Sequence, residues 1–401
     1  MKIINNLGFW LAISILFCFL SYPTTLSLSQ SPQSFWYLER IHLQGAWQVT
    51  KGSSDITVAI IDSGINGTHE DLQGSLWINP SEVDGNAIDD DGNGYIDDIN
   101  GWDFHDNDND PLTGTPIHWH GTFVAGLITA QDNAKGVVGV APNVKIMDLR
   151  ILDETNILAP ANLHLFIEAI EYAVEMGAEI INLSLALIGT PPPAFINAID
   201  NAIGNGTIVV GVTGNQNSSI PFPGSHPDVI AVAATNFQNQ KANYSNYGPE
   251  AELSAPGGDP NEPVEKWISS TFSQPGEPLY ASAYGTSFAC PLVTGTIALM
   301  LSIYPALTLS EVRTILHQTA IDLGIPGKDN DFGYGLVNAS AAVSMAASMN
   351  PDYTSSSSST SSTGSSSLTT PTPAFTIIAG AILPLFLIYS IRRQRKMKDL
   401  Q

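Results

Sequence analysis

The chain has 401 residues, 43% of them apolar, so it is long enough to bury one large hydrophobic core or two ordinary ones. It carries 38 acidic and 15 basic residues, giving a net charge of −23, and no Lys or Arg occurs between Gly52 and Ala134. A field this acidic repels nucleic acid and favours cations, so the composition excludes a nucleic-acid-binding function.

The N-terminal residues 1–29 have the layout of a secretory signal peptide. Lys2 precedes an apolar run over 9–20, and small and polar residues follow it. The run is short for a membrane span, although an uncleaved signal anchor is the alternative. Once this segment is removed, Cys290 is the only cysteine left, so we expect no internal disulfide.

Residues 30–350 read as one continuous domain in which strands and helices alternate. Short β-branched runs predict buried strands at 56–62, 145–152, 179–186, 207–214 and 228–235. Helical periodicity marks 163–178, with Leu163, Phe166, Ile167, Ile170 and Val174 on one face, and a second helix covers 194–203. This alternation predicts an α/β fold with a mostly parallel central sheet and helices on both faces. In such folds the active site lies beyond the carboxyl ends of the strands.

The C-terminal segments predict a membrane anchor. Residues 351–373 form a Ser/Thr-rich stalk, 374–391 are an apolar stretch long enough to cross a bilayer, and 392–401 are a basic tail. The positive-inside rule puts this tail in the cytoplasm. We therefore expect a single-pass protein of the cell membrane with its main domain outside. The segment also resembles microbial sorting signals, in which a transpeptidase replaces the span.

Three motifs carry side chains suited to catalysis. In "IIDSGINGTHEDL" a carboxylate, Asp62, closes an apolar strand; in "HGTFVAGLITA" His120 opens an apolar helix; in "YGTSFACP" Ser287 stands at another helix start. Taken singly, each has an ordinary structural explanation. Asp62 could form a turn, His120 could be a structural histidine, and Ser287 could be a helix N-cap.

Together these motifs resemble the subtilisin-like serine proteases, the subtilase family. The order Asp, His, Ser is the family's, and the likeness runs from about 35 to 347 through stretches such as "GVVGVAPNVKI", "SNYGPEAELSAPG" and "DFGYGLVNA". The resemblance implies a subtilisin-like fold and a serine endopeptidase, a monomer acting on protein or peptide substrates. Ser287 would be the nucleophile, His120 the general base and Asp62 the group that orients His120.

The resemblance also implies further site residues. Asn215 in "VVGVTGNQNS" would be the side-chain donor to the oxyanion. Substrate-binding residues would be Ser184, Leu185 and Ala186 in "NLSLA", together with Gly214. Ala186 replaces a Gly of the family and would narrow the primary pocket. Two more departures flank His120: Phe123 replaces a His, and Trp119 would cover the imidazole on the substrate side or pack on the surface.

Other functions fit the sequence less well. A catalytically inactive surface adhesin on the same fold is disfavoured because all four catalytic groups are present. An α/β-hydrolase needs a Gly-x-Ser-x-Gly elbow and the order Ser, acid, His, neither of which occurs around Ser287. Relatives that use Glu in place of His are disfavoured by "HGTFVAG". Only about thirty residues separate the expected signal cleavage from Asp62, so we expect no inhibitory prodomain.

An acidic insertion between Asp62 and His120 predicts a structural Ca²⁺ site. In "DDDGNGYIDDIN" acidic or amide side chains alternate and Gly94 allows a sharp turn. The expected ligands are Asp89, Asp91, Asn93, the Tyr95 carbonyl and Asp97. Position twelve is Asn100 and not the bidentate Glu of an EF-hand, and a solvated acidic turn is the alternative.

A second Ca²⁺ site is implied by the family resemblance alone. The segment "HGTFVAGLITAQDNAKGVVGVAP" aligns without a gap to the family's calcium-binding loop. The ligands carried over are the side chains of Asp71 and Asn133 and the carbonyls of Gln131, Lys135 and Val137. All are hard oxygens, which suit calcium better than zinc.

Overall fold

The structure is a computed structural model, which describes residues 15–17, 24–25, 35–110 and 117–353. Its helices cover these ranges: α1 Trp36–Arg40, α2 Leu43–Trp47, α3 Trp119–Thr129, α4 Leu163–Glu175, α5 Pro193–Gly204, α6 Thr286–Ile303, α7 Leu309–Thr319 and α8 Ala339–Met349. Short 3-10 turns occur at Pro160–Asn162 and Val264–Lys266. The predicted span and tail, and the predicted stalk from residue 354 on, lie outside the described residues.

A seven-stranded sheet forms the centre of the domain, with strand order β11-β10-β9-β7-β3-β5-β4. All its neighbouring strands pair in parallel. The strands are β3 Thr57–Asp62, β4 Gly101–Asp103, β5 Lys145–Arg150, β7 Ile180–Leu183, β9 Ile208–Val212, β10 Ile230–Thr235 and β11 Leu253–Pro256. The five strands predicted from sequence are confirmed, whereas β4 and β11 were not predicted.

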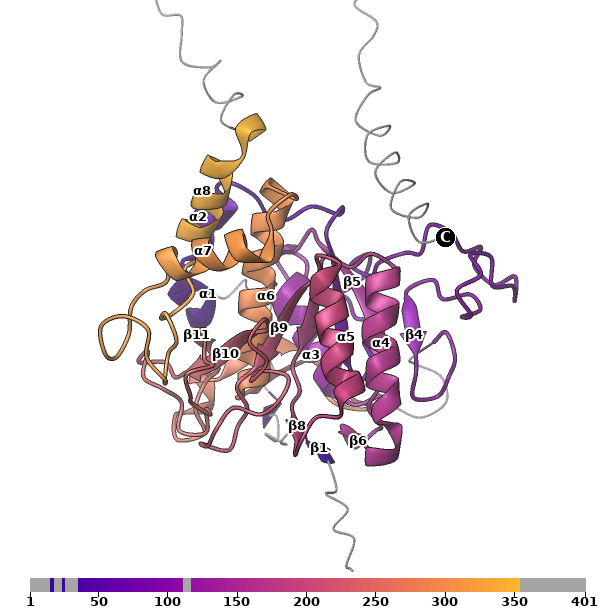
Figure 1. The fold of residues 1–401 in the computed structure, drawn as a ribbon, viewed down its shortest axis with the longest axis horizontal. Coiled ribbons are helices and arrows are strands. Elements are labelled where there is room, and N and C mark those ends of the chain that lie inside the picture. Colours follow the sequence, from indigo (N-terminus) through magenta and orange to yellow (C-terminus); the bar gives the residue numbers. More distant parts are fainter. Residues whose placement is uncertain (1–14, 18–23, 26–34, 111–116, 354–401) are drawn as a thin grey trace, which may run out of the picture. The chain divides into compact units, whose positions relative to one another are not determined.

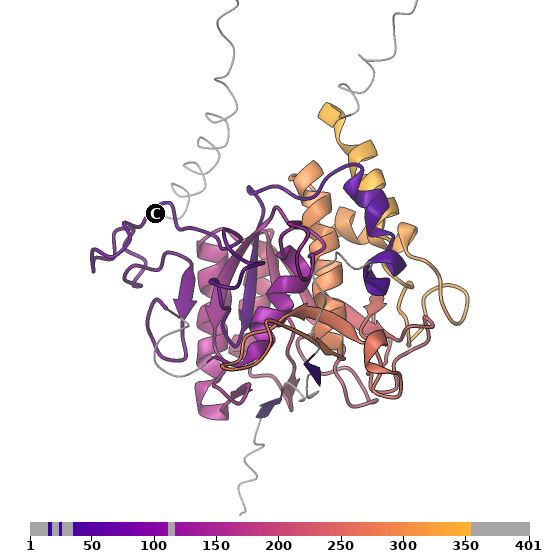
Figure 2. The same ribbon diagram turned by 180° about the vertical axis from the view of Figure 1, so that it is seen from behind.

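Two hydrophobic clusters, one on each face, hold the sheet between layers of helices. The side chains of α4 and α5 pack into one cluster, and these two helices lie side by side in Figure 1. The side chains of α3 and α6 pack into the other, on the face seen in Figure 2. Strand residues buried on both faces explain the continuous apolar runs of the sequence. The predicted α/β fold is confirmed.

Helix α4 begins where predicted but ends at Glu175, short of the predicted range 163–178, and it is buried on a slightly different face. Phe166 and Ile170 are fully buried as expected, together with Ala169, Tyr172 and Ala173. Leu163, Ile167 and Val174 are only partly buried. The buried stripe is therefore rotated from the predicted one, so that it includes Ala169, Tyr172 and Ala173.

Two small antiparallel sheets complete the described part of the domain. Strands β12 Ile268–Thr271 and β13 Tyr280–Ala283 pair, and β2 Thr24–Thr25 joins β13. Strand β1 Ile15–Phe17 pairs on one side with β6 Ile157–Leu158 and on the other with β8 Leu187–Ile188. Strand β1 thus lies between β6 and β8 and pairs with both.

Helix α6 is the one described helix long and apolar enough to cross a membrane, and 89% of it is buried within the domain. Burial on this scale is expected of a helix at the centre of a protein core. We therefore interpret α6 as a core helix.

Candidate active site

The ends of the parallel strands bring the first two predicted catalytic residues together. Asp62 is the last residue of β3, and His120 is the second residue of α3. The His120 Nδ1 atom lies 2.9 Å from Asp62 Oδ1 and 3.0 Å from Oδ2. Asp62 is 1% exposed and His120 4% exposed, so solvent screens this pair little. The contact leaves Nε2 as the imidazole nitrogen able to act on a substrate.

The loop after Asp62 is joined to the start of α3 by backbone contacts. The Ser63 N–H donates to Asp62 Oδ1, and the Ser63 hydroxyl donates to the His118 carbonyl and accepts from the Gly121 N–H. A Cβ atom on Gly121 would stand 2.5 Å from the Gly64 carbonyl oxygen. A residue without a side chain is therefore required at position 121 for the loop to approach His120 closely.

His118 caps α3 and stays neutral. Its Nδ1 atom accepts from the His120 N–H at 3.3 Å. Burial, helped by the charge of His120, lowers the pKa of His118 to about 3. A neutral imidazole is what an acceptor at a helix N-terminus requires.

Ser287 is the second residue of α6, whose N-cap is Gly285, so Ser287 is not the capping residue. The side chain is 6% exposed, and its hydroxyl donates to the Ser184 carbonyl at 2.9 Å. Being in the first helical turn, Ser287 has its own N–H among those unpaired within the helix, and the helix dipole favours negative charge there.

Asn215 lies beyond the end of β9 and faces the start of α6. Its side-chain oxygen accepts from the N–H of Thr286 at 2.9 Å and from the Thr286 hydroxyl at 2.8 Å. These two contacts fix the amide orientation and leave its NH₂ group as donor to a ligand. The preceding Gly214 has φ +96°, and a Cβ there would stand 2.5 Å from the Asn246 amide nitrogen. Glycine is therefore needed at position 214.

The predicted substrate-binding residues follow β7 directly. Ser184, Leu185 and Ala186 are all buried, and β8 begins at the next residue. Strand β8 pairs with β1 through Leu187 and Leu16. The segment Ser184–Ala186, predicted to pair with extended substrate, therefore continues into β8, which pairs with the extended strand β1.

Trp119 does not lie on the surface, and its ring lies against the His120 imidazole at a centroid distance of 5.8 Å. It is buried, and its ring packs at centroid distances of 5.5–6.3 Å against Phe272, Phe123 and Phe288. Phe123, the other departure from the family motif, packs against Phe288 at 4.5 Å. The two departures thus belong to one aromatic cluster, whose rings Trp119 and Phe288 also contact His120.

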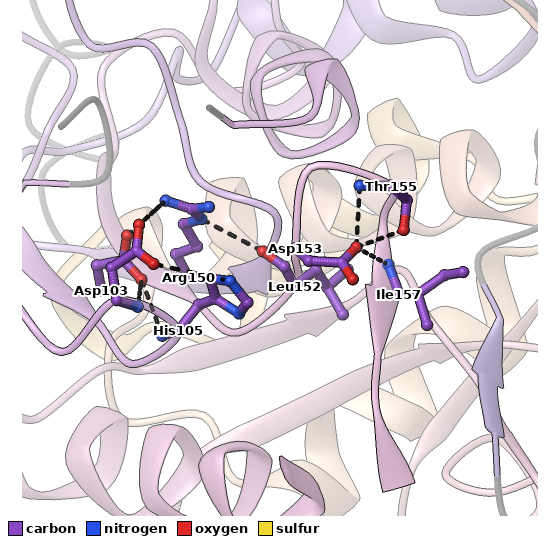
Figure 3. Close-up of polar contacts among 8 residues, drawn as sticks. Asp103, His105, Arg150, Leu152, Asp153, Thr155 and Ile157 are labelled. Carbon is purple, nitrogen blue, oxygen red and sulfur yellow. Dashed lines mark hydrogen bonds and ion pairs between the residues drawn. The ribbon is translucent and has the colours of Figure 1, made fainter. Parts of the chain in front are cut away.

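Sequence reasoning missed a buried charge next to Asp62. Arg150 ends β5 and is the register partner of both Asp62 and Asp103. Its side chain and that of Asp103 are 0% exposed, and Arg150 NH1 lies 2.7 Å from Asp103 Oδ2. Its Nε donates to the Leu152 carbonyl, as Figure 3 shows. An arginine inside the apolar run "KIMDLRIL" was the available signal, since a buried charge requires a partner.

The structure brings together the five residues predicted for the second calcium site. Asp71 is buried; one carboxylate oxygen accepts from the Asn133 amide at 2.9 Å and the other from the Val137 N–H at 3.1 Å. The Asp71 carbonyl accepts from the Gln131 N–H, and the Lys135 N–H donates to the Asn133 side chain. The five predicted residues therefore form one compact loop cluster.

The acidic insertion gathers a different set of carboxylates from the predicted one. Asp89 accepts from the N–H groups of residues 92, 93 and 94, and Asp97 accepts from those of residues 86 and 87. The carboxylates that lie within 4.8 Å of one another are Glu82, Asp91 and Asp98. Of the predicted ligands only Asp91 belongs to this group. Asp89 and Asp97 instead satisfy backbone donors of tight turns, a common role for Asp.

Two other predicted ligands of the insertion also make contacts of their own. The Asn93 amide donates to Asp98 at 2.8 Å, so Asn93 lies at the edge of the acidic group. The Tyr95 ring packs against Trp102, Phe104 and Tyr172. Asp98 is also bound by Tyr172 and Asn79, and burial raises its pKa.

Comparisons with known proteins agree with this geometry. The family model described as "Subtilase family" matches residues 53–335. The chain is 37% identical over 301 residues to a thermophilic serine proteinase of Bacillus sp. (strain AK1), covering 75% of this chain and 64% of that protein. It is 32% identical over 308 residues to the halolysin-like extracellular serine protease Nep of Natrialba magadii, covering 76% of this chain and 50% of that protein.

A solved structure shows the same fold. The crystal structure of a lanthipeptide protease superposes with a TM-score of 0.62 at 27% identity, covering 79% of this chain and 99% of that one. The chain spans about half to two thirds of the length of the two sequence relatives.

Proposed function

Since the chain belongs to the subtilase family, we propose that it is a serine endopeptidase with Asp62, His120 and Ser287 as catalytic triad. The observation that carries the proposal is the buried contact of Asp62 with His120 Nδ1, at the same end of the sheet as the first turn of α6. An inactive adhesin would have no need to bury this carboxylate against an imidazole.

In the proposed mechanism, His120 takes the proton of Ser287 as the hydroxyl attacks the scissile carbonyl. It later delivers that proton to the leaving amine. Asp62 holds the imidazole in the tautomer that leaves Nε2 able to accept, and it stabilises the imidazolium that forms. The Ser287 hydroxyl, which donates to the Ser184 carbonyl in this structure, has to redirect its proton toward Nε2.

The tetrahedral intermediate would be stabilised by two donors. The Asn215 NH₂ group is one, because its amide oxygen is held by Thr286, and the Ser287 N–H at the start of α6 is the other. Loss of such an amide donor lowered turnover by about 10²–10³ in a subtilisin, a magnitude taken from that relative.

We propose that substrates bind as an extended strand between β6 and β8. These strands flank β1 in an antiparallel arrangement, and main-chain pairing of this kind gives affinity without selecting side chains. Selection would then fall to side-chain pockets at Ser184–Ala186 and Gly214. The Ala186 methyl group, in place of a glycine, would disfavour very bulky side chains.

The activity is tested on the full chain in mild detergent. Wild type should hydrolyse a peptide library and be labelled by a fluorophosphonate, while Ser287→Ala should lose both with an unchanged melting temperature. The matched control is Ser282→Ala, another buried serine, which bonds to Ser269 and should keep activity. Full hydrolysis by Ser287→Ala would overturn the triad assignment, and an unlabelled wild type would favour the inactive adhesin.

We further propose that calcium stabilises the domain at two places. Glu82, Asp91 and Asp98 face one another in a stretch without Lys or Arg, so the three carboxylates repel unless a cation or a proton intervenes. Asp71 is a buried carboxylate that receives only neutral donors in its described contacts. Oxygen ligands of this kind suit Ca²⁺.

The calcium proposal is tested by thermal unfolding of the Ser287→Ala chain, which cannot digest itself. Unfolding should shift upward in millimolar calcium relative to chelator, since an ion that binds only the folded state adds about 2.7 kcal/mol at a hundredfold excess over its Kd. Asp98→Asn and Asp71→Asn should each reduce the shift, whereas Asp84→Asn, an exposed change in the same insertion, should not. Coincident curves in calcium and chelator would overturn the proposal.

We also propose the segment organisation predicted from sequence: residues 1–29 as signal peptide, 30–350 as an extracellular peptidase domain and 374–391 as the membrane anchor. The apolar stretch flanked by stalk and basic tail supports it, and one relative is named an extracellular protease. In intact cells, external protease should release the domain while a C-terminal tag stays protected. A tag removed from outside would reverse the orientation.

A further inference from the structure

The first turns of α6 lack one backbone hydrogen bond. In an α-helix the carbonyl of each residue accepts from the N–H four residues later. Pro291 stands four residues after Ser287, inside α6, and has no N–H to donate. The carbonyl of the proposed nucleophile therefore has no donor within its own helix at that position, and a buried carbonyl left unpaired is costly.

Ser184 supplies a donor to that carbonyl. Its hydroxyl donates to the Ser287 carbonyl oxygen at 3.0 Å, from the segment that follows β7. The Ser184 side chain is buried, and a hydroxyl has a single proton to give. This contact, between residues 103 positions apart in the chain, takes the place of the helical bond that Pro291 removes.

Three further buried side chains fix the direction of the Ser184 proton. The Asn182 amide donates to Ser184 Oγ at 2.9 Å, and the Thr294 hydroxyl donates to the Asn182 side-chain oxygen at 2.8 Å. Cys290 Sγ donates to the same Asn182 oxygen at 3.4 Å. With that oxygen accepting from both groups, the Asn182 NH₂ group faces Ser184, so Ser184 Oγ accepts a proton from Asn182 and donates its own to Ser287.

The donors thus form one relay, from Thr294 through Asn182 and Ser184 to the Ser287 carbonyl. Hydrogen bonds aligned in one direction polarise and strengthen one another. All of these residues are buried. The relay ends on the residue that also provides the attacking hydroxyl and one proposed oxyanion donor, so a displacement of Ser287 moves both.

We propose that Ser184, Asn182 and Thr294 are positioning residues of the nucleophile, which hold the first turn of α6 in place of the amide that Pro291 lacks. The proposal rests on the proposed function insofar as Ser287 is the nucleophile. It explains why a proline can be accommodated so close to a residue whose position has to be held within a fraction of an ångström.

The relay is tested by returning the missing donor to the helix. Ser184→Ala removes the hydroxyl but keeps the Ser184 carbonyl, and it should lower kcat roughly tenfold to a hundredfold with little change in KM. Pro291→Ala restores an N–H at the position that bonds to the Ser287 carbonyl. In the Ser184→Ala chain it should recover most of the lost kcat, whereas alone it should have little effect. A double variant no faster than Ser184→Ala would overturn the proposal.

The far end of the relay offers a matched pair of variants on one helix. Thr294→Val removes the hydroxyl donor to Asn182 without changing size and leaves only the longer Cys290 contact. It should lower kcat several-fold, while Thr294→Ser should restore it. Thr296→Val is the control, because Thr296 is equally buried on α6 but bonds only to the Leu292 carbonyl of its own helix. Equal kcat for Thr294→Val and Thr296→Val would also overturn the proposal.

A second readout separates this inference from the proposed activity. The melting temperatures of the Ser184→Ala and Pro291→Ala single and double variants should be non-additive, because both changes act on one carbonyl. If wild type neither hydrolyses peptides nor reacts with a fluorophosphonate, the proposed function fails, yet the coupling should persist. If wild type is active and the melting temperatures add, the relay is refuted and the activity stands.

Discussion

Arg150→Met tests whether the buried ion pair beside Asp62 stabilises the domain. Methionine keeps much of the length and apolar character of the side chain but removes the guanidinium that contacts Asp103 at 2.7 Å. Asp103 would keep its backbone donors, the N–H groups of His105 and Asp106. Removing one partner of a fully buried pair leaves the other charge uncompensated, and we expect a loss of about 3–5 kcal/mol in the free energy of unfolding.

The pH dependence of this loss follows from the Asp103 carboxyl. Burial raises its pKa, while the neighbouring Arg150 charge lowers it. Without Arg150 the folded-state pKa rises further above the unfolded value, so the stability of the variant falls as pH increases through that range. The destabilisation should therefore be smaller at pH 5 than at pH 8. Adding Asp103→Asn removes the orphaned charge and should recover most of the loss.

The assay is denaturant unfolding of the full chain carrying Ser287→Ala, so that self-digestion does not interfere. Free energies are compared at pH 5 and pH 8 for the parent, Arg150→Met and the Arg150→Met, Asp103→Asn double variant. A loss below about 1 kcal/mol at pH 8, typical of an exposed pair, would refute the reasoning. So would a double variant no more stable than Arg150→Met.

Three further variants give expected outcomes. Burial raises the pKa of Glu179 to about 7, so wild type should lose up to about 3 kcal/mol of folding stability between pH 4.5 and 7. Glu179→Gln can still accept from the Thr57 N–H and should remove this loss. An unchanged pH dependence of stability would contradict this. Burial also raises the pKa of Asp148, so Asp148→Asn should gain stability relative to wild type as pH rises, measured by thermal unfolding at pH 5 and 9. Asn215→Ala should lower kcat by about 10²–10³ with KM nearly unchanged; a loss confined to KM would indicate a binding role.

Local patterns of the sequence predicted the centre of the fold. The strands that carry the site, β3, β7 and β9, are runs of β-branched residues buried on both faces, and such runs are visible without any partner. Strands β4 and β11 were missed because they are short and contain Gly and Pro, which are rare in strands. They form at the edges of the sheet, where pairing with a longer neighbour outweighs local preference.

Contacts between distant segments could not be predicted. The sequence places Ser184 in a substrate-binding edge, but its hydroxyl meets Ser287 only because β7 ends beside the start of α6. Trp119 was expected to cover His120 or to pack on the surface, and the structure buries its ring against Phe272, the residue after β12. In both cases the partner lies more than a hundred residues away, and nothing local in the sequence specifies which distant side chain fills the space.

The acidity of the chain is not confined to its surface, and the buried carboxylates are accommodated in different ways. Asp62 meets an imidazole, Asp103 meets a guanidinium, and Asp148 has one backbone donor and a strongly raised pKa. Asp98 receives neutral donors and faces two other carboxylates. The raised pKa values of Asp98, Asp103 and Asp148 all lower stability as pH rises. Calcium binds the ionised carboxylate, and of these three residues only Asp98 belongs to a proposed calcium site. Bound calcium should therefore offset the part of the stability loss that is due to Asp98. The metal-free domain should lose stability with rising pH more steeply than the calcium-loaded domain.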